Sequence, residues 1–200
     1  MIKTIIFDLS EVYLKGIKGI ENHLSPILNL SNEEIKKVIY NQDLERLFHC
    51  EITENEYIKN TIEKGSWKIE IGLFKELIRK NFEEIDGTRK ILEELKKNGY
   101  KLGLLSVHSK EWVEYLEKKF DYHKLFDSII YSFEISISKP DKKAYQHILE
   151  KLNSKPEDCL FIDDMIKNTN AAKELGINVI VFKSAEQLKN EIKDFGINIR

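Results

Sequence analysis

Ile5-Ile6-Phe7-Asp8-Leu9-Ser10-Glu11-Val12 is the stretch that decides the fold predicted for this chain of 200 residues. Three apolar residues lead directly into one carboxylate, a pattern typical of a short buried strand in a parallel sheet. Asp8 would then lie at the carboxyl end of the strand, where open α/β sheets bind their ligands. A single Asp after a strand also occurs as the cap of an ordinary turn. Whether Asp8 is a site residue or such a cap therefore depends on the residues that follow the other strands.

Polar residues follow three more apolar runs in the same way. Ser106 comes after Leu104-Leu105, Lys139 follows a third run, and Asp163-Asp164 follows Leu160-Phe161-Ile162. The carboxyl ends of parallel strands lie at one edge of a sheet. One sheet would therefore bring all four groups to the same edge.

The remaining pattern indicates the fold class. Strand patterns at residues 101–106, 128–132, 160–163 and 179–182 alternate with helical patterns. Alternation of this kind predicts an α/β fold with a doubly wound parallel sheet, in which helices cover both faces.

A helical pattern without strand alternation separates the first strand from the others, between about residues 20 and 82. We expect about four helices there, placed as a cap over the active edge of the sheet. The chain then divides into an α/β core of residues 1–15 and 84–200 and a helical cap of residues 16–83. Helices packed elsewhere on the core are the alternative. Two capping boxes support the helical interpretation, Ser31 with Glu34 and Thr53 with Glu56.

Composition limits the partners. The chain has 32 basic and 34 acidic residues and a net charge of −2, so neither nucleic acid nor a membrane surface is expected as the main partner. No apolar run approaches the ~20 residues of a membrane-spanning helix. The N-terminus enters a strand without a signal-peptide pattern. Cys50 and Cys159 are expected to be buried, reduced thiols, which favours a cytoplasmic protein.

The order of the four motifs resembles that of the haloacid dehalogenase (HAD)-like hydrolase superfamily, in its helical-cap subfamily. These enzymes use a nucleophilic Asp, then a Ser or Thr, then a Lys or Arg, then an acidic pair. The resemblance runs from Ile2 to about Phe182 and is greatest to small sugar-phosphate phosphatases and to the N-terminal phosphatase domains of epoxide hydrolases. The segment from Leu47 to Thr53 is similar to a cap-helix turn in that group. The resemblance implies a Rossmann-like core and a Mg²⁺-dependent phosphatase that acts on a small phosphorylated metabolite.

The resemblance also implies a role for each motif. Asp8 would attack phosphorus to form an aspartyl phosphate, while Ser106, the backbone N–H of Val107 and Lys139 would bind the phosphoryl oxygens. Without the other motifs, Lys139 would read as an ordinary solvated residue, and the acidic pair as partners of a helix dipole. The residues implied for the Mg²⁺ site are Asp8, the backbone carbonyl of Ser10, Asp163 and Asp164.

Ser10 is the main departure from the family pattern, which usually has a second Asp here as the general acid and base. Ser cannot take that role at neutral pH. His108 and Glu11 are the nearby substitutes, although each is expected to be exposed. His49, near the cap turn, could contact substrate.

Two other functions therefore stay open. One is a metal-free haloacid dehalogenase that uses Asp8 against carbon, against which the acidic pair argues. The other is a catalytically weak relative that binds phosphorylated ligands or a partner protein, which Ser10 keeps open. The substrate and the oligomeric state cannot be read from the sequence.

Overall fold

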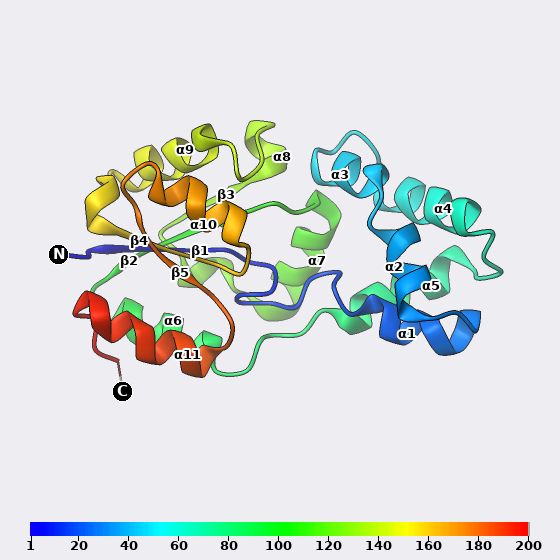
Figure 1. Cartoon of the computed structure of the whole chain (residues 1–200), viewed down its shortest axis with the longest axis horizontal. Helices are drawn as coiled ribbons and strands as arrows, with labels where there is room; N and C mark the ends of the chain where they lie inside the picture. The colour runs from blue at the N-terminus through cyan, green and yellow to red at the C-terminus, as the bar shows by residue number, and fades with distance from the viewer. Residues whose placement is uncertain (200) are drawn as a thin grey trace.

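A computed structural model describes residues 1–199 of the chain. Figure 1 shows two groups of elements: a sheet with helices around it, and a separate group of five helices beyond the carboxyl ends of the strands. The N-terminus lies at the end of the sheet that faces away from the helical group (Figure 1).

The sheet has five parallel strands in the order β3-β2-β1-β4-β5. β1 lies at its centre, and its four side chains are all buried. This order confirms the predicted doubly wound parallel sheet, because the chain moves outward from β1 in both directions. The strands are β1 (Thr4–Phe7), β2 (Lys101–Ser106), β3 (Ser128–Tyr131), β4 (Cys159–Asp163) and β5 (Asn178–Val181).

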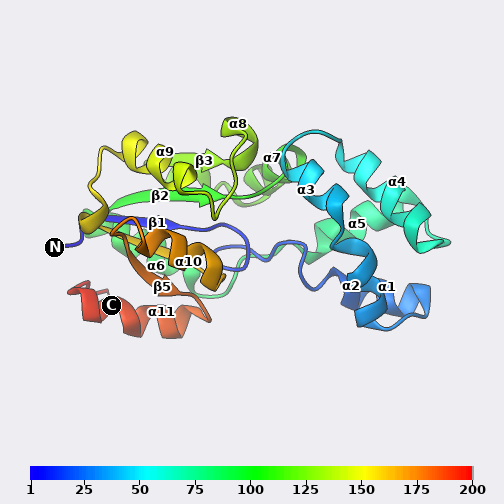
Figure 2. The same cartoon turned by 45° about the horizontal axis from the view of Figure 1, so that its top comes forward.

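Helices cover both faces of the sheet, as Figure 2 shows. Alternate residues of β1 belong to two separate apolar clusters, with Ile5 and Phe7 in one and Ile6 in the other. The first cluster contains residues of α6 (Thr88–Lys97), α7 (Lys110–Phe120) and α11 (Ala185–Glu191); the second contains residues of α9 (Lys142–Leu152) and α10 (Ile166–Lys173). The remaining short helices are α8 (Ser132–Ile135), η1 (His123–Leu125), η2 (Pro156–Asp158) and η3 (Ile192–Phe195).

The helical group has five helices rather than about four. The helical conformation is interrupted after α2. Asn41 then caps the start of the short α3, where its side chain accepts a hydrogen bond from Asp43 N–H at 2.7 Å. Both predicted capping boxes are present, at the starts of α2 and α4. The five helices are α1 (Ile20–Leu28), α2 (Asn32–Ile39), α3 (Gln42–Phe48), α4 (Glu54–Gly65) and α5 (Ile71–Asn81).

Two chain segments join the helical group to the sheet, and they lie side by side. Lys15 N–H donates to Glu83 O at 2.8 Å, and Ile85 N–H donates to Tyr13 O at 2.9 Å. The side chain of Asn81 donates to Gly16 O at 2.7 Å, which ties the end of α5 to the first crossing. The two crossings therefore form a short two-stranded connection.

Two local expectations are wrong. Cys159 is buried as expected, but Cys50 is exposed, because it lies in the turn after α3 in a left-handed conformation with φ 57°. Ser132 does not end the third core strand but begins α8, whose capping box forms around Tyr131 and Glu134. Among the described residues, no helix is long and apolar enough to cross a membrane.

Candidate active site

Asp8 follows β1 directly and lies at the centre of a buried ionic cluster. Its backbone N–H donates to Ile162 O at 2.9 Å, which continues the pairing with β4 and places it level with Asp163. Lys139 Nζ lies 2.9 Å from Asp8 Oδ1 and 2.6 Å from Asp163 Oδ2. All three side chains are at least nine-tenths buried. The structure thus brings together the first, third and fourth sequence motifs.

Asp164 completes a set of three carboxylates. One oxygen each of Asp8, Asp163 and Asp164 lies within 4.8 Å of the other two. Lys139 contacts two of the three carboxylates and Lys18 also acts on Asp164, so the three negative charges still exceed the positive charge near them. Hard oxygen donors with uncompensated negative charge are the ligand set that Mg²⁺ takes in proteins. The residues present therefore fit the implied metal.

The pKa values of the cluster are shifted by burial and by the closeness of its charged groups. Burial raises the pKa of Asp8 from 3.8 to about 7; the Lys139 ammonium opposes this shift and the Asp163 carboxylate adds to it. Burial, followed by the neighbouring charge of Asp163, also raises the pKa of Asp164. The pKa of Lys139 is raised although its burial acts to lower it, because Asp163 and Asp8 stabilise the ammonium form.

Asn168 is a site residue that the sequence did not reveal. It lies in α10, is buried, and donates its side-chain N–H groups to both oxygens of Asp163 at 3.0 Å. Met165 N–H donates to Asp163 Oδ1 at 2.8 Å. These contacts fix the orientation of the Asp163 carboxylate. The available signal was a polar residue on the inward face of a helix, five positions after the acidic residue that it holds.

Ser106 ends β2 at the same edge of the sheet. Leu104 pairs with Phe7, so Ser106 lies just beyond the level of Asp8. Its hydroxyl is buried and has no hydrogen-bond partner among the described residues. A buried unpaired hydroxyl is uncommon and calls for a partner. Val107 follows in the loop and is half-buried.

Ser10 and Glu11 form the turn after Asp8. Glu11 has a left-handed backbone, with φ 60°, and its carboxylate accepts a hydrogen bond from Gly16 N–H at 2.9 Å. Glu11 is half-buried, so the expectation that it is exposed is wrong. Burial raises the pKa of its carboxyl group, and the nearby Asp164 carboxylate contributes to this rise. Ser10 lies against Gly16, where an added Cβ would be 3.0 Å from the Ser10 hydroxyl oxygen.

His108 is also not exposed: only 2% of it is accessible. Its ring packs against the rings of Phe48, Phe82 and Trp112. Its Nδ1 accepts a hydrogen bond from Ser109 N–H at 3.1 Å. Burial lowers the pKa of His108 from 6.5 to about 4, and the Arg79 charge lowers it further against the effect of that hydrogen bond. A neutral imidazole at pH 7 cannot serve as the missing general acid.

This environment predicts a pH-dependent contribution to stability. Because the pKa of His108 is lower in the folded state than in the unfolded chain, the unfolded state binds the proton more tightly. The free energy of unfolding should therefore fall as the pH drops from about 6.5 toward 4, by on the order of 3 kcal/mol from this group. The measurement is denaturant unfolding at pH 7 and pH 4.5 of the wild type and of His108→Asn, which keeps an acceptor near the Nδ1 position.

The variant is expected to be less stable at pH 7, because it loses ring packing. The difference in unfolding free energy between the two proteins should narrow at pH 4.5, because there the wild-type imidazole takes up a proton when the chain unfolds, which favours the unfolded state, and Asn does not. Carboxylate titrations are common to both proteins and cancel. A gap that stays constant between the two pH values would contradict the prediction.

The turn after α3 lies against the core at the Lys139 loop. Ser138 Oγ lies 3.1 Å from His49 Nε2, and the Ser132 hydroxyl donates to Phe48 O at 3.0 Å. His49 is half-buried. The structure therefore places His49 next to the residue that precedes Lys139, at the boundary between the helical group and the core.

The structure thus combines a parallel α/β sheet with a buried Asp–Lys–Asp cluster at its carboxyl edge. Residues 4–182 match the family model described as haloacid dehalogenase-like hydrolase. The chain belongs to this family.

Three of the curated relatives have names that describe hydrolases or phosphatases. The chain is 26% identical over 148 residues to flavin mononucleotide hydrolase 1 of Arabidopsis thaliana, covering 74% of this chain and 60% of that protein. It is 34% identical over 109 residues to a phosphorylated carbohydrates phosphatase of Thermotoga maritima, covering 54% and 48%. It is 30% identical over 117 residues to a glyceraldehyde 3-phosphate phosphatase of Methanocaldococcus jannaschii, covering 56% and 50%. The matched region thus spans about half to three-fifths of these relatives.

Solved structures share the fold at low sequence identity. A HAD family enzyme from Bacteroides thetaiotaomicron in complex with magnesium and inorganic phosphate aligns with a TM-score of 0.76 and 20% identity over 92% of this chain and 96% of that chain. A predicted HAD-like hydrolase from Porphyromonas gingivalis aligns over 100% of both chains with a TM-score of 0.77 and 19% identity. A dehalogenase aligns with a TM-score of 0.72 and 19% identity over 89% of this chain and 83% of that chain.

Proposed function

We propose that this hydrolase is a Mg²⁺-dependent phosphatase that cleaves a small phosphorylated metabolite through an aspartyl phosphate on Asp8. The observation that carries the proposal is the gathering of Asp8, Lys139, Asp163 and Asp164 at one edge of the sheet. The unpaired Ser106 hydroxyl at the same edge supplies a donor for a phosphoryl oxygen. The named activities of the curated relatives support a phosphorylated substrate.

In the first step, an oxygen of Asp8 attacks phosphorus and the bond between phosphorus and the leaving oxygen breaks. Leu9 N–H donates to Asp8 Oδ1 at 2.7 Å, and Lys139 lies 2.9 Å from the same atom. These contacts hold Oδ1 and leave Oδ2 as the attacking oxygen. The leaving alkoxide must then take up one proton. In the second step, water attacks the phosphorus of the aspartyl phosphate, and inorganic phosphate and the Asp8 carboxylate are released.

The other residues stabilise charge. The Lys139 ammonium balances the negative charge that gathers on the phosphoryl oxygens in the transition state. The Ser106 hydroxyl and the Val107 N–H would donate to those oxygens. The carboxylates of Asp8, Asp163 and Asp164, with the carbonyl of Ser10, would hold Mg²⁺. When bound, the metal supplies positive charge to the phosphoryl group.

We further propose that residues 16–83 act as a cap on a core of residues 1–15 and 84–200. The helices α1 to α5 lie beyond the carboxyl ends of the strands, and the turn after α3 reaches the Lys139 loop (Figure 1). A lid in this position excludes water from the reacting groups and lines the space for the rest of the substrate. His49 is the cap residue best placed to contact substrate.

Removal of the metal should abolish the proposed activity. Without a divalent cation, the three carboxylates repel an anionic substrate more strongly than the Lys139 ammonium attracts it. We expect chelator to lower turnover of p-nitrophenyl phosphate by roughly 100-fold or more, because a lost transition-state charge interaction in a buried site has effects of this size. Added Mg²⁺ should restore it, and Ca²⁺, which prefers longer bonds and more ligands, should restore less.

The same assay separates the rival functions. A metal-free dehalogenase would release halide from a 2-haloacid equally well in chelator and in Mg²⁺. A binding protein would retain phosphate affinity without turnover under either condition. Equal phosphatase turnover with and without chelator would rule out the metal part of the proposal.

A further inference from the structure

A second buried carboxylate, outside the Asp8 cluster, joins the helical group to the core. Glu54 begins α4 and is only 1% exposed. Its Oε1 accepts a hydrogen bond from Trp112 Nε1 of core helix α7 at 2.6 Å. Its Oε2 accepts from Arg79 Nη2 at 2.7 Å and lies 2.8 Å from Lys75 Nζ, both on α5. A carboxylate this deeply buried needs such partners, so the position of α4 is bound to that of α7.

The backbone of Glu54 makes a second contact with the same helix. Its N–H donates to Glu111 Oε1 at 3.1 Å. Glu111 and Trp112 are neighbours in the first turn of α7, which begins at the N-cap Ser109. One residue of the helical group is therefore held by two successive residues of the core, through its side chain and through its backbone.

Trp112 connects this contact to the end of β2. Its ring lies 5.7 Å from the ring of His108, measured between centroids, and packs edge to face. The Ser109 hydroxyl accepts a hydrogen bond from Trp112 N–H at 3.3 Å. His108 and Ser109 directly follow Ser106 and Val107. A shift of Trp112 would thus move His108 and Ser109, and with them the loop that carries the Ser106 hydroxyl and the Val107 N–H.

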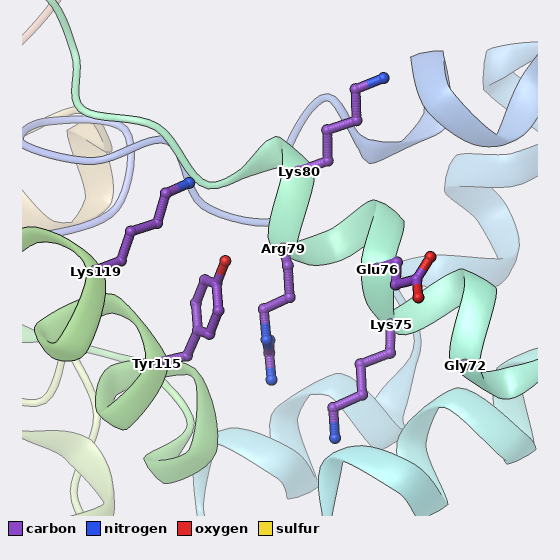
Figure 3. A pocket seen from close by; sticks show the side chains of 7 residues that line it. All are labelled: Gly72, Lys75, Glu76, Arg79, Lys80, Tyr115 and Lys119. Atoms are coloured by element: carbon purple, nitrogen blue, oxygen red, sulfur yellow. The ribbon is translucent and has the colours of Figure 1, made fainter.

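The boundary is open to solvent beside these contacts. Figure 3 shows Arg79 and Lys75 extending in the same direction from α5, with the ring of Tyr115 on α7 beside the Arg79 side chain. The Arg79 guanidinium lies 4.6 Å from the centre of the Tyr115 ring. An open cavity of about 630 Å³ lies along the two helices here; its lining residues are Gly72, Lys75, Glu76, Arg79, Lys80, Tyr115 and Lys119. The Glu54 contacts therefore hold a boundary that is not closed by continuous packing.

One feature of Arg79 destabilises the closed boundary between the helical group and the core. Its Nη1 is buried and has no hydrogen-bond partner among the described residues. An unpaired buried donor of a charged group is unfavourable, and opening of the boundary would let water satisfy it. The closed arrangement thus combines the strong hydrogen bond between Glu54 and Trp112 with the unpaired Arg79 Nη1 donor. This combination is expected of a contact between the helical group and the core that can form and break.

We propose that Glu54 is a positioning residue that latches the helical group onto α7 and thereby holds the loop of Ser106 and Val107 in the geometry that binds phosphate. Glu54 touches none of the proposed reacting groups and acts through Trp112. The effect on phosphate binding rests on the proposed function, whereas the latch itself does not.

Trp112→Phe tests the latch, because it removes the indole N–H and keeps an aromatic ring. A hydrogen bond to a charged group changes an equilibrium by about 10-fold or more. Exchange of the Glu54 backbone N–H, which is protected by a contact across the boundary, should therefore become about 10-fold faster. The dissociation constant of inorganic phosphate in the presence of Mg²⁺, measured by calorimetry, should rise by roughly five-fold or more. For p-nitrophenyl phosphate, KM should rise while kcat changes little.

Tyr57→Phe is the matched control. It also removes one buried hydrogen bond from the aromatic group around Trp112, but this bond runs from Tyr57 Oη to Ile39 O within the helical group, at 3.0 Å. We expect no change in Glu54 exchange or in phosphate affinity. Glu111→Ala, at a half-buried position of α7, removes the second contact without disturbing the ring and should shift both quantities in the same direction as Trp112→Phe, by a smaller factor.

Equal effects of Trp112→Phe and Tyr57→Phe would overturn the proposal, because a general loss of packing would then explain both. Unchanged Glu54 exchange in Trp112→Phe and Glu111→Ala would show that no latch exists. Faster exchange with unchanged phosphate affinity would show that the latch does not position the loop. Exchange and phosphate binding need no turnover, so a failure of the proposed phosphatase activity is recognised separately.

Discussion

Asp8→Asn is expected to reduce hydrolysis of p-nitrophenyl phosphate by roughly 10⁴-fold or more, the scale on which loss of a covalent nucleophile acts in other enzymes. An amide oxygen neither attacks phosphorus effectively nor carries the charge that binds Mg²⁺. The substitution keeps the shape of the side chain, and its oxygen can still accept from Leu9 N–H and from Lys139, which contact Oδ1 in the native protein. The variant should therefore fold normally.

The control is Asp194→Asn, which removes the same charge from an exposed position near the C-terminus. It should retain wild-type turnover. Thermal unfolding of both variants shows whether the fold is kept, and mass spectrometry of the wild type after rapid quenching should detect one added phosphoryl group on the peptide that contains Asp8. Wild-type turnover in purified Asp8→Asn would show that Asp8 is not the nucleophile.

The sheet could be predicted from the sequence because its strands are buried on both faces. β1 and β4 hide every side chain and β2 hides all but Lys101, so hydrophobicity alone marks these three strands. The register then follows, since parallel strands that begin level at Thr4 and Lys101 carry Asp8 and Ser106 to the same edge. Lys139 does not follow a strand directly as expected: β3 ends at Tyr131, and it is the loop after α8 that brings Lys139 beside Asp8 and Asp163.

The burial and contacts of a side chain could not be predicted where they depend on elements distant in the sequence. Histidine is polar, so His108 was expected to be exposed; its burial depends on Phe48 and Phe82, which the helical group brings to it. Asn168 holds Asp163 only because a turn of α10 faces the end of β4. Glu11 is half-buried because the chain returns on itself and offers the N–H of Gly16. Local patterns carry no information about these encounters.

Ser10 gives the second large expected effect. While Asp8 attacks phosphorus, charge builds up on the leaving oxygen, and an acid placed there accelerates the reaction by roughly 10²–10⁴-fold, equivalent to about 3–5 kcal/mol of barrier. Ser10 is neutral and short, so this contribution should be missing. An aryl leaving group such as p-nitrophenol is already acidic and needs no proton. We therefore expect the wild-type protein to cleave aryl or acyl phosphates more readily than alkyl phosphates.

Ser10→Asp should narrow this difference by accelerating the alkyl substrates most. Ser10 is half-buried and lies against Gly16, which has no side chain of its own. The backbone carbonyl at position 10 is unchanged, so the proposed metal ligand survives. The added carboxylate also raises the pKa of its acidic neighbours, so we expect recovery of part of the lost factor. The measurement is kcat/KM for matched aryl and alkyl phosphates in both proteins, with Ser10→Asn as the control that adds bulk without an acid.

The structure reduces the candidates for a substitute acid. His108 is buried, accepts a hydrogen bond on Nδ1 and is neutral at pH 7, and the remaining N–H of a neutral imidazole is too weak an acid to protonate the leaving oxygen. Glu11 stays a candidate, since its half-buried carboxyl group has a raised pKa and lies in the turn beside Asp8. If the wild type shows no preference for aryl phosphates, then Glu11→Gln should create one. A wild type without that preference, together with a Glu11→Gln variant that also lacks it, would mean that neither residue supplies the proton and that proton transfer does not limit the rate.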